Sequence, residues 1–216
     1  MLDTKAIFLS LQLALWTLVV LIPIGIGVGY WLAQTGPWKS WAEAALALPL
    51  VLPPTVLGYY FIVAFAGRSL LGEPLVFSFT GLLIASIIIN LPFAIQPIQR
   101  AYEAIPSEIK EAAKVSGLST WQRFRLIELP LAWRGILSGG AMTFAHTLGE
   151  FGVVLMVGGA IPGETKTASI AIYDKVQTFD TAGAGALSLV LLLISLIAIA
   201  ISYGLLAQNR MGVRRA

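Results

Sequence analysis

Residues 111–130 read EAAKVSGLSTWQRFRLIELP, and this charged, helix-forming stretch interrupts a chain that is otherwise strongly apolar. Of the 216 residues, 57% are hydrophobic and only 12% are charged, whereas about a quarter of the residues of a typical soluble domain are charged. A soluble fold of this composition would expose large apolar patches and aggregate. The composition therefore predicts a membrane protein, and the polar stretch predicts a segment outside the lipid.

Five stretches are long and apolar enough for helices that cross a bilayer, which need about 20 mostly apolar residues. They lie near 7–33, 43–66, 80–99, 131–158 and 184–207. We expect a single all-α, polytopic domain over residues 1–216, with a polar loop at 101–130 between the third and fourth spans. The first apolar run exceeds the roughly 7–15 residues of a signal-peptide core, so it is expected to remain as a span.

The distribution of Lys and Arg predicts the orientation, because cytoplasmic loops carry the excess of these residues. Ten lie on the side of the polar loop and four on the other side. The ten are Lys39, Arg100, Lys110, Lys114, Arg123, Arg125, Arg134, Arg210, Arg214 and Arg215, and the four are Lys5, Arg68, Lys166 and Lys175. We therefore expect the N-terminus outside and the C-terminus in the cytoplasm.

The second expected span contains Pro49, Pro53 and Pro54. Each Pro removes a backbone donor and clashes with the preceding turn, and in lipid the freed carbonyls need partners from neighbouring protein or from water. The pattern predicts a kinked or broken helix packed inside a bundle. Two interpretations stay open, namely a discontinuous helix beside a solute pathway and an ordinary kinked helix.

In the fourth expected span, a polar stripe follows helical spacing. Gly139, Thr143, His146 and Glu150 recur at steps of four, three and four residues, so they share one face of a helix. An imidazole or a carboxylate that faces lipid is costly, so this face is expected to point into the bundle or into a dimer interface. His146 and Glu150 are one turn apart, and we expect them within hydrogen-bonding reach.

This stripe either lines a pathway or gate, or packs helices together. For His146 we favour packing, and for Glu150 an internal pairing within a hinge formed by Gly149 and Gly152, because a dianion pathway does not need a fixed carboxylate. The candidate gate or pathway residues are Thr143, His146, Thr147, Gly149, Glu150, Phe151 and Gly152.

Capping residues in the polar loop predict two short helices joined at a glycine. Ser107 can cap the first helix, and Gly117 suits the left-handed conformation that ends it. Ser119 or Thr120 can cap a second helix that runs to Glu128. A loop that only rests at the headgroups with snorkelling Arg and Trp would explain the composition, but not a glycine between two capped helices.

The same stretch resembles the cytoplasmic signature of bacterial ABC-importer permeases, in which Glu-Ala-Ala is followed at fixed spacing by Gly, Ile and Leu-Pro. These positions are filled by Glu111, Ala112, Ala113, Gly117, Ile127, Leu129 and Pro130. The resemblance implies a type I ABC importer permease fold in a bacterial-type plasma (inner) membrane. It also implies that the loop couples to a separate ATPase subunit.

The chain has no G-x-x-x-x-G-K-[ST] loop with which to bind ATP. ATP and magnesium are therefore expected to act on the partner ATPase, and no cofactor is expected in this chain. With one His, no Cys and a single clear intramembrane acid, a membrane-embedded enzyme is a remote alternative. An ion-coupled secondary transporter is a second alternative, for which the polar loop would be dispensable.

Two further stretches, LPLVLPPTVLGYY at 48–60 and LGEFGVVLMVGGAIPGETKT at 148–167, are similar to molybdate permeases. These permeases belong to a wider oxyanion group that includes sulfate and tungstate. The resemblance implies the permease subunit of an ATP-driven oxyanion importer, with molybdate as the first expectation and sulfate or tungstate as alternatives.

The resemblance also implies the partners, which are a second copy of the chain, two ATP-binding subunits and an external oxyanion-binding protein. No nucleic-acid partner is expected. The candidate contact for the binding protein is a turn-rich loop formed by Pro162, Gly163, Glu164, Thr165 and Lys166. The following segment, 168–180, reads as a short amphipathic helix.

Overall fold

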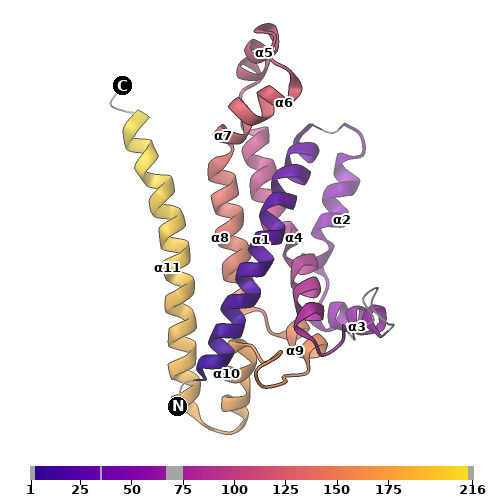
Figure 1. The fold of residues 1–216 in the computed structure, drawn as a ribbon, viewed down its shortest axis with the longest axis vertical. Helices are drawn as coiled ribbons and strands as arrows, with labels where there is room; N and C mark the ends of the chain where they lie inside the picture. Colours follow the sequence, from indigo (N-terminus) through magenta and orange to yellow (C-terminus); the bar gives the residue numbers. More distant parts are fainter. Residues whose placement is uncertain (1–2, 35, 67–74, 214–216) are drawn as a thin grey trace.

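The computed structural model describes residues 3–34, 36–66 and 75–213, with side chains through residue 202, as a bundle of helices (Figure 1). In chain order the helical segments are α1 (Thr4–Gln34), α2 (Lys39–Val51), α3 (Pro54–Phe65), α4 (Phe79–Glu103), α5 (Ser107–Val115), α6 (Thr120–Arg123), the π-helix η1 (Phe124–Glu128), α7 (Leu129–Leu131), α8 (Trp133–Gly149), α9 (Gly152–Gly158), α10 (Ala168–Gln177) and α11 (Thr181–Val213). The expected all-α fold class is confirmed.

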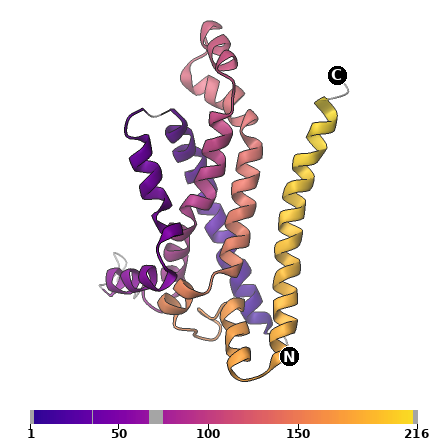
Figure 2. The same ribbon diagram turned by 180° about the vertical axis from the view of Figure 1, so that it is seen from behind.

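The centre of the bundle is α4, which packs against both α1 and α8, and α1 and α8 also pack against each other. Glycines allow this close packing: a Cβ on Gly29 of α1 would stand 3.1 Å from the Gln99 backbone nitrogen, and one on Gly139 of α8 would stand 2.7 Å from the Ala94 carbonyl oxygen. Small residues at helix contacts are the usual basis of close helix packing in membranes. Figures 1 and 2 show α11 along one side of this core and α2 with α3 on the other.

Membrane-length helices are the main feature of the described residues. Three are long and apolar enough to cross a bilayer, namely α1, α4 and the part of α11 from Thr181 to Ser202. Two further pairs of helices, α2 with α3 and α8 with α9, qualify when each bent pair is taken as one span. The expected spans near 7–33, 80–99 and 184–207 fall on the three single helices.

The two remaining expected spans are broken rather than straight. Between α2 and α3 the chain turns by 103° at Leu52 and Pro53, and between α8 and α9 it turns by 60° at Glu150 and Phe151. Pro49 lies inside α2 and does not end it, while Pro54 occupies the first turn of α3, where its missing N–H has no partner to lose. The expected break in the second span is therefore present, and its position is Leu52–Pro53.

The two ends of the bundle differ in character. The α5–α6 unit projects beyond the ends of α4 and α8, whereas α9 and α10 lie at the opposite end (Figures 1 and 2). The N-terminus is at the α10 end and the C-terminus is at the α5–α6 end. The two termini therefore lie at opposite ends of the bundle.

Candidate functional site

The first helix of the polar loop starts at a different cap from the expected one. Ser107 is already the first residue of α5, the N-cap position is Pro106, and no side chain caps this end. The prediction for Ser107 is wrong because Pro106 has the extended backbone that precedes a helix, with φ −53° and ψ 139°.

The end of α5 has the predicted left-handed glycine, since Gly117 has a φ of +78°. The Gly117 amide donates to the Lys114 carbonyl at 3.1 Å, and the Leu118 amide donates to the Ala113 carbonyl at 3.3 Å. This pair of bonds is the Schellman arrangement that satisfies the last carbonyls of a helix. The chain therefore turns sharply at Gly117 into the second helix.

The second helix begins with a complete capping box. The Ser119 hydroxyl accepts a hydrogen bond from the Gln122 amide, and the Gln122 side chain accepts one from the Ser119 amide. Ser119, not Thr120, is thus the cap. The helix then changes to π-helical geometry over Phe124–Glu128, which the sequence did not predict, and it continues through Leu129–Pro130 toward α8.

The seven signature residues fall into an exposed group and an anchoring group. Glu111, Ala112 and Gly117 are exposed at the tip of the projection, while Ala113 is only 6% exposed. The anchoring group, Ile127, Leu129 and Pro130, lies on the segment that leads into α8. The exposed group lies outside the bundle, and the anchoring group connects it to the spans.

A cavity of about 680 Å³ lies where the two bent spans meet. It brings together residues that are far apart in sequence: those from α2 and α3 include Pro49, Leu52 and Pro54, and those from the α8–α9 bend include His146, Gly149, Glu150, Phe151 and Gly152. The two bends are in close contact, because a Cβ on Gly152 would stand 2.8 Å from Pro54 Cβ. Five of the seven candidate gate residues therefore line one cavity.

The hydrogen bond expected between His146 and Glu150 is replaced by separate contacts with α4. His146 Nδ1 lies 2.9 Å from Asn90 Oδ1, and the imidazole stacks on Phe93 with a centroid separation of 4.1 Å. Glu150 Oε2 accepts a bond of 3.4 Å from the Ser86 hydroxyl. The prediction is wrong because α8 ends at Gly149 and the extended backbone of Glu150 takes its side chain off the helical stripe.

Three α4 residues, Ser86, Asn90 and Phe93, are thus part of this site although the sequence reasoning did not select them. Ser86 and Asn90 are fully buried, and the Asn90 amide donates to the Ser86 carbonyl at 2.8 Å. The signal that could have found Asn90 is its amide within an otherwise apolar span, since buried polar side chains in membranes need partners. Its partner could not be identified without the packing of α4 against α8.

The other two candidate gate residues do not line the cavity. Thr143 is fully buried, and its hydroxyl has no hydrogen-bond partner among the described residues. Thr147 is 3% exposed and donates to the Thr143 carbonyl at 2.8 Å. Both hydroxyls are enclosed by the helix packing, so a direct role for them in a pathway finds no support in this geometry.

The loop after α9 contains exposed and buried members of the candidate contact. Pro162, Gly163 and Glu164 are exposed. Thr165 is fully buried, and its hydroxyl donates to the Gly158 carbonyl at 2.6 Å while it accepts from the Ile161 amide at 2.9 Å. Thr165 therefore shapes the loop from inside, and the expectation of a surface contact by its hydroxyl is corrected.

Lys166 is also engaged, in an ion pair of 2.5 Å with Asp174 of α10. The predicted short helix at 168–180 is present as α10, which ends at Gln177. At this end of the bundle the tip of the loop is exposed, and so are residues 176–180 at the end of α10.

The membrane-length helices, together with the two bent pairs, make this chain a multi-pass membrane protein. The chain belongs to the family described as the binding-protein-dependent transport system inner membrane component, which matches residues 22–211. Two curated relatives are similar over most of their length. The molybdenum transport system permease protein ModB of Azotobacter vinelandii is 42% identical over 191 residues, which is 84% of each chain.

ModB of Escherichia coli strain K12 is 33% identical over 218 residues, covering 96% of this chain and 95% of that protein. Among solved structures, a bacterial alginate ABC transporter in complex with an alginate pentasaccharide-bound periplasmic protein matches with a TM-score of 0.75 and 17% identity. That match covers 92% of this chain and 76% of the other. The fold is that of a type I ABC importer permease.

Proposed function

We propose that this chain is the membrane-spanning permease subunit of an ATP-driven importer that carries molybdate across the plasma membrane. The observation that carries the proposal is the likeness to the ModB permeases over at least 84% of the chain. The projecting α5–α6 unit is consistent with it, because a transport subunit without an ATP-binding loop needs a surface on which a separate ATPase can dock.

In this proposal the exposed part of the signature, Glu111, Ala112 and Gly117, lies in a groove of the ATPase. ATP and magnesium act on that partner, which moves the α5–α6 unit and exchanges an inward-open for an outward-open state. The transport subunit itself is assigned no chemical step. We propose that the two bends around the cavity are the elements that change between these states, and Gly149 and Gly152 flank one of them.

The orientation that we propose places the α5–α6 end in the cytoplasm. The C-terminus lies at the same end, so the N-terminus is outside, as the Lys and Arg distribution predicts. Of the residues in that count, Arg68, Arg214 and Arg215 lie outside the described residues. An external binding protein would then meet the opposite end, where Pro162, Gly163 and Glu164 are exposed.

A second copy of the chain is proposed to complete the pathway. Large apolar residues beside the cavity are exposed on α2 and α3, notably Leu50, Val51, Tyr59 and Tyr60, with exposed fractions of 47–77%. A facing copy would cover them and close the cavity on its open side. Two copies would also present two α5–α6 units, one for each of two ATPase subunits.

The test is reconstitution of the permease, its ATPase and its binding protein in proteoliposomes, with uptake of molybdate measured with and without ATP. The proposal expects ATP-dependent uptake that needs the binding protein. Competition by tungstate and sulfate separates the three oxyanions. Uptake that follows a proton or sodium gradient and persists without the ATPase would instead identify a secondary transporter.

A further inference from the structure

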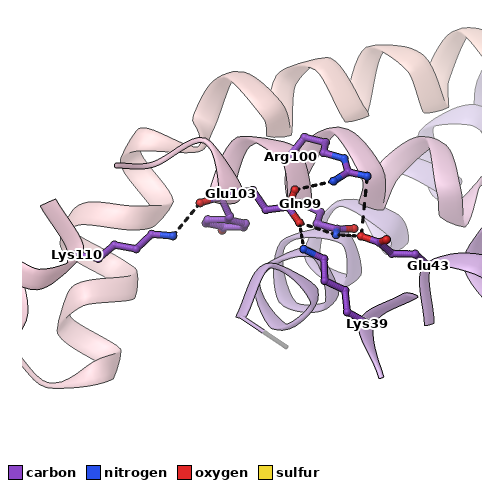
Figure 3. Close-up of polar contacts among 7 residues, drawn as sticks. Lys39, Glu43, Gln99, Arg100, Glu103 and Lys110 are labelled. Carbon is purple, nitrogen blue, oxygen red and sulfur yellow. Dashed lines mark hydrogen bonds and ion pairs between the residues drawn. The ribbon is translucent and has the colours of Figure 1, made fainter. Parts of the chain in front are cut away.

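A polar cluster at the α5–α6 end of the bundle joins α2 to α4 (Figure 3). Lys39 Nζ and Glu103 Oε1 are 2.5 Å apart, and Arg100 Nη1 donates to Glu103 Oε2 at 2.7 Å. The Gln99 amide donates to both Glu43 and Glu103, at 2.5 and 2.9 Å. We call these five residues the polar latch.

The polar latch attaches this end of α2 to α4. No residue of α2 is buried within this chain, so the helix adds no fully buried apolar side chain to the core. The latch is partly shielded, since Gln99 is 1% exposed and the Glu103 side chain is 21% exposed. Charge-assisted hydrogen bonds are stronger than neutral ones, and more so when they are partly removed from water.

The α4 side of the latch is connected directly to α5. Glu103 is the last residue of α4, and α5 begins four residues later at Ser107. Across this short connection, Lys110 of α5 donates to the Tyr102 carbonyl at 3.1 Å (Figure 3). A displacement of α5 therefore acts on the turn of α4 that carries the latch.

The α2 side of the latch leads to the cavity. After Val51 the chain bends by 103° into α3, and α3 packs against α9. This packing is close, because a Cβ on Gly58 of α3 would stand 2.6 Å from the Met156 sulfur. The bend itself contributes Leu52 and Pro54 to the cavity wall.

We propose that the polar latch is a rigid link through which movement of α5 reaches the bend at Leu52–Pro53 and so the cavity. Lys39, Gln99 and Glu103 are its positioning residues and need no contact with the solute. The proposal rests on the proposed function, because it requires an ATPase that moves α5. The alternative role is a static one, in which the same bonds only stabilise the fold.

The test is the number of anions transported per ATP hydrolysed by the complete transporter in proteoliposomes. In the Lys39→Ala and Glu103→Gln variants we expect this ratio to fall about fivefold or more, the lower end of the range typical for coupling between two sites. Lys39→Arg retains the cation and is expected to keep most of the ratio. A static role predicts less folded protein with an unchanged ratio, and that result in both broken variants would overturn the proposal.

The matched control is Lys175→Ala, which removes an ion pair of 2.6 Å with Asp180 at the other end of the bundle. We expect this variant to leave the transport ratio unchanged. A wild-type transporter that does not carry molybdate would overturn the proposed function instead. The role of the latch is judged only by the difference between variant and wild type in the number of anions transported per ATP hydrolysed. The two failures are therefore distinguishable.

A second measurement does not depend on the solute. Because the chain contains no Cys, spin labels can be placed at Trp41→Cys on α2 and Val115→Cys on α5, positions that are 74% and 87% exposed. With the latch intact, we expect the distance between the labels to stay constant when the docked ATPase binds nucleotide, and with Lys39→Ala we expect it to change. A distance that behaves alike in both proteins would overturn the proposal.

Discussion

The α5–α6 projection and the cavity at the two bends differ in what holds their residues in place. In the projection, the cap of α6 joins residues three apart, Ser119 and Gln122, and the turn at Gly117 is closed by bonds between near neighbours. In the cavity, His146 and Glu150 depend on partners 56 and 64 residues away in the sequence. Local bonds therefore shape the projection by itself, whereas the residues at the cavity depend on how α8 and its bend pack against α4.

The largest loss of uptake is expected from Gly117→Pro, which disrupts the short-range bonds of the α5–α6 projection. Pro fixes φ near −65°, whereas Gly117 has a φ of +78° and donates its amide to Lys114. A backbone forced from such a conformation costs about 1–3 kcal/mol, so the turn between α5 and α6 is lost. We expect ATP-driven uptake to fall below detection while the protein remains in the membrane.

The control for this change is Gly117→Asn, because Asn tolerates the left-handed region better than other residues with a side chain. This variant should keep most of the uptake. Full uptake and ATPase binding by the Pro variant would show that α5–α6 is not the coupling unit.

The next effect concerns the distant side, where Glu150→Gln keeps the shape of the side chain and replaces its carboxyl group with an amide. This carboxyl group accepts from Ser86 across the α4 contact, and a typical hydrogen bond contributes about 0.5–1.5 kcal/mol. We expect uptake to fall about tenfold, with copurification of the ATPase unchanged. Wild-type uptake would leave Glu150 with a packing role alone.

A smaller effect, on stability, is expected from a substitution between α4 and α8. The packing of these two helices brings Asn90 close to His146. In Gly135→Ala, the new Cβ would stand 2.6 Å from the Pro97 carbonyl oxygen, and overpacking of this kind costs about 1–3 kcal/mol. We expect a lower unfolding temperature in detergent, followed by tryptophan fluorescence.

The matched control is Gly185→Ala on α11, where a Cβ meets nothing within 4 Å. Ala is favoured over Gly in a helix by roughly 0.5–1 kcal/mol, so the same substitution should leave stability equal or higher. An equal loss in both variants would contradict the proposed closeness of α4 and α8.

The smallest effect is a local change in helix stability, and it should differ between substitutions of Ser119 and Ser107. Ser119→Ala removes a capping box and should cost about 1 kcal/mol of local helix stability, seen as faster amide hydrogen exchange in α6. Ser107→Ala should have no such effect, because Ser107 forms no cap hydrogen bond. Faster exchange in α5 of the Ser107 variant would restore the discarded cap assignment.

The sequence predicted the features that depend on contacts between residues close in sequence, and it missed those that depend on contacts between different spans. Gly117 and Ser119 could be identified because a left-handed turn and a capping box depend on residues within a few positions. The break near Pro53 and Pro54 was predictable for the same reason, since Pro acts on its own helix. Asn90 and Ser86 were missed because their partners come from another span, and no local pattern indicates which spans are neighbours.

By itself, the sequence determined that this is an all-α membrane protein with a polar, two-helix projection, because hydrophobicity, helix caps and proline act over a few residues. Only the tertiary structure decided that the two bent spans meet at one cavity, that His146 and Glu150 bond to α4 rather than to each other, and that Lys39 is paired with Glu103. These contacts depend on how α4 packs against α2 and α8. The close approach of α8 to α4 is set by Gly135 and Gly139, and only the folded chain reveals which helices are neighbours.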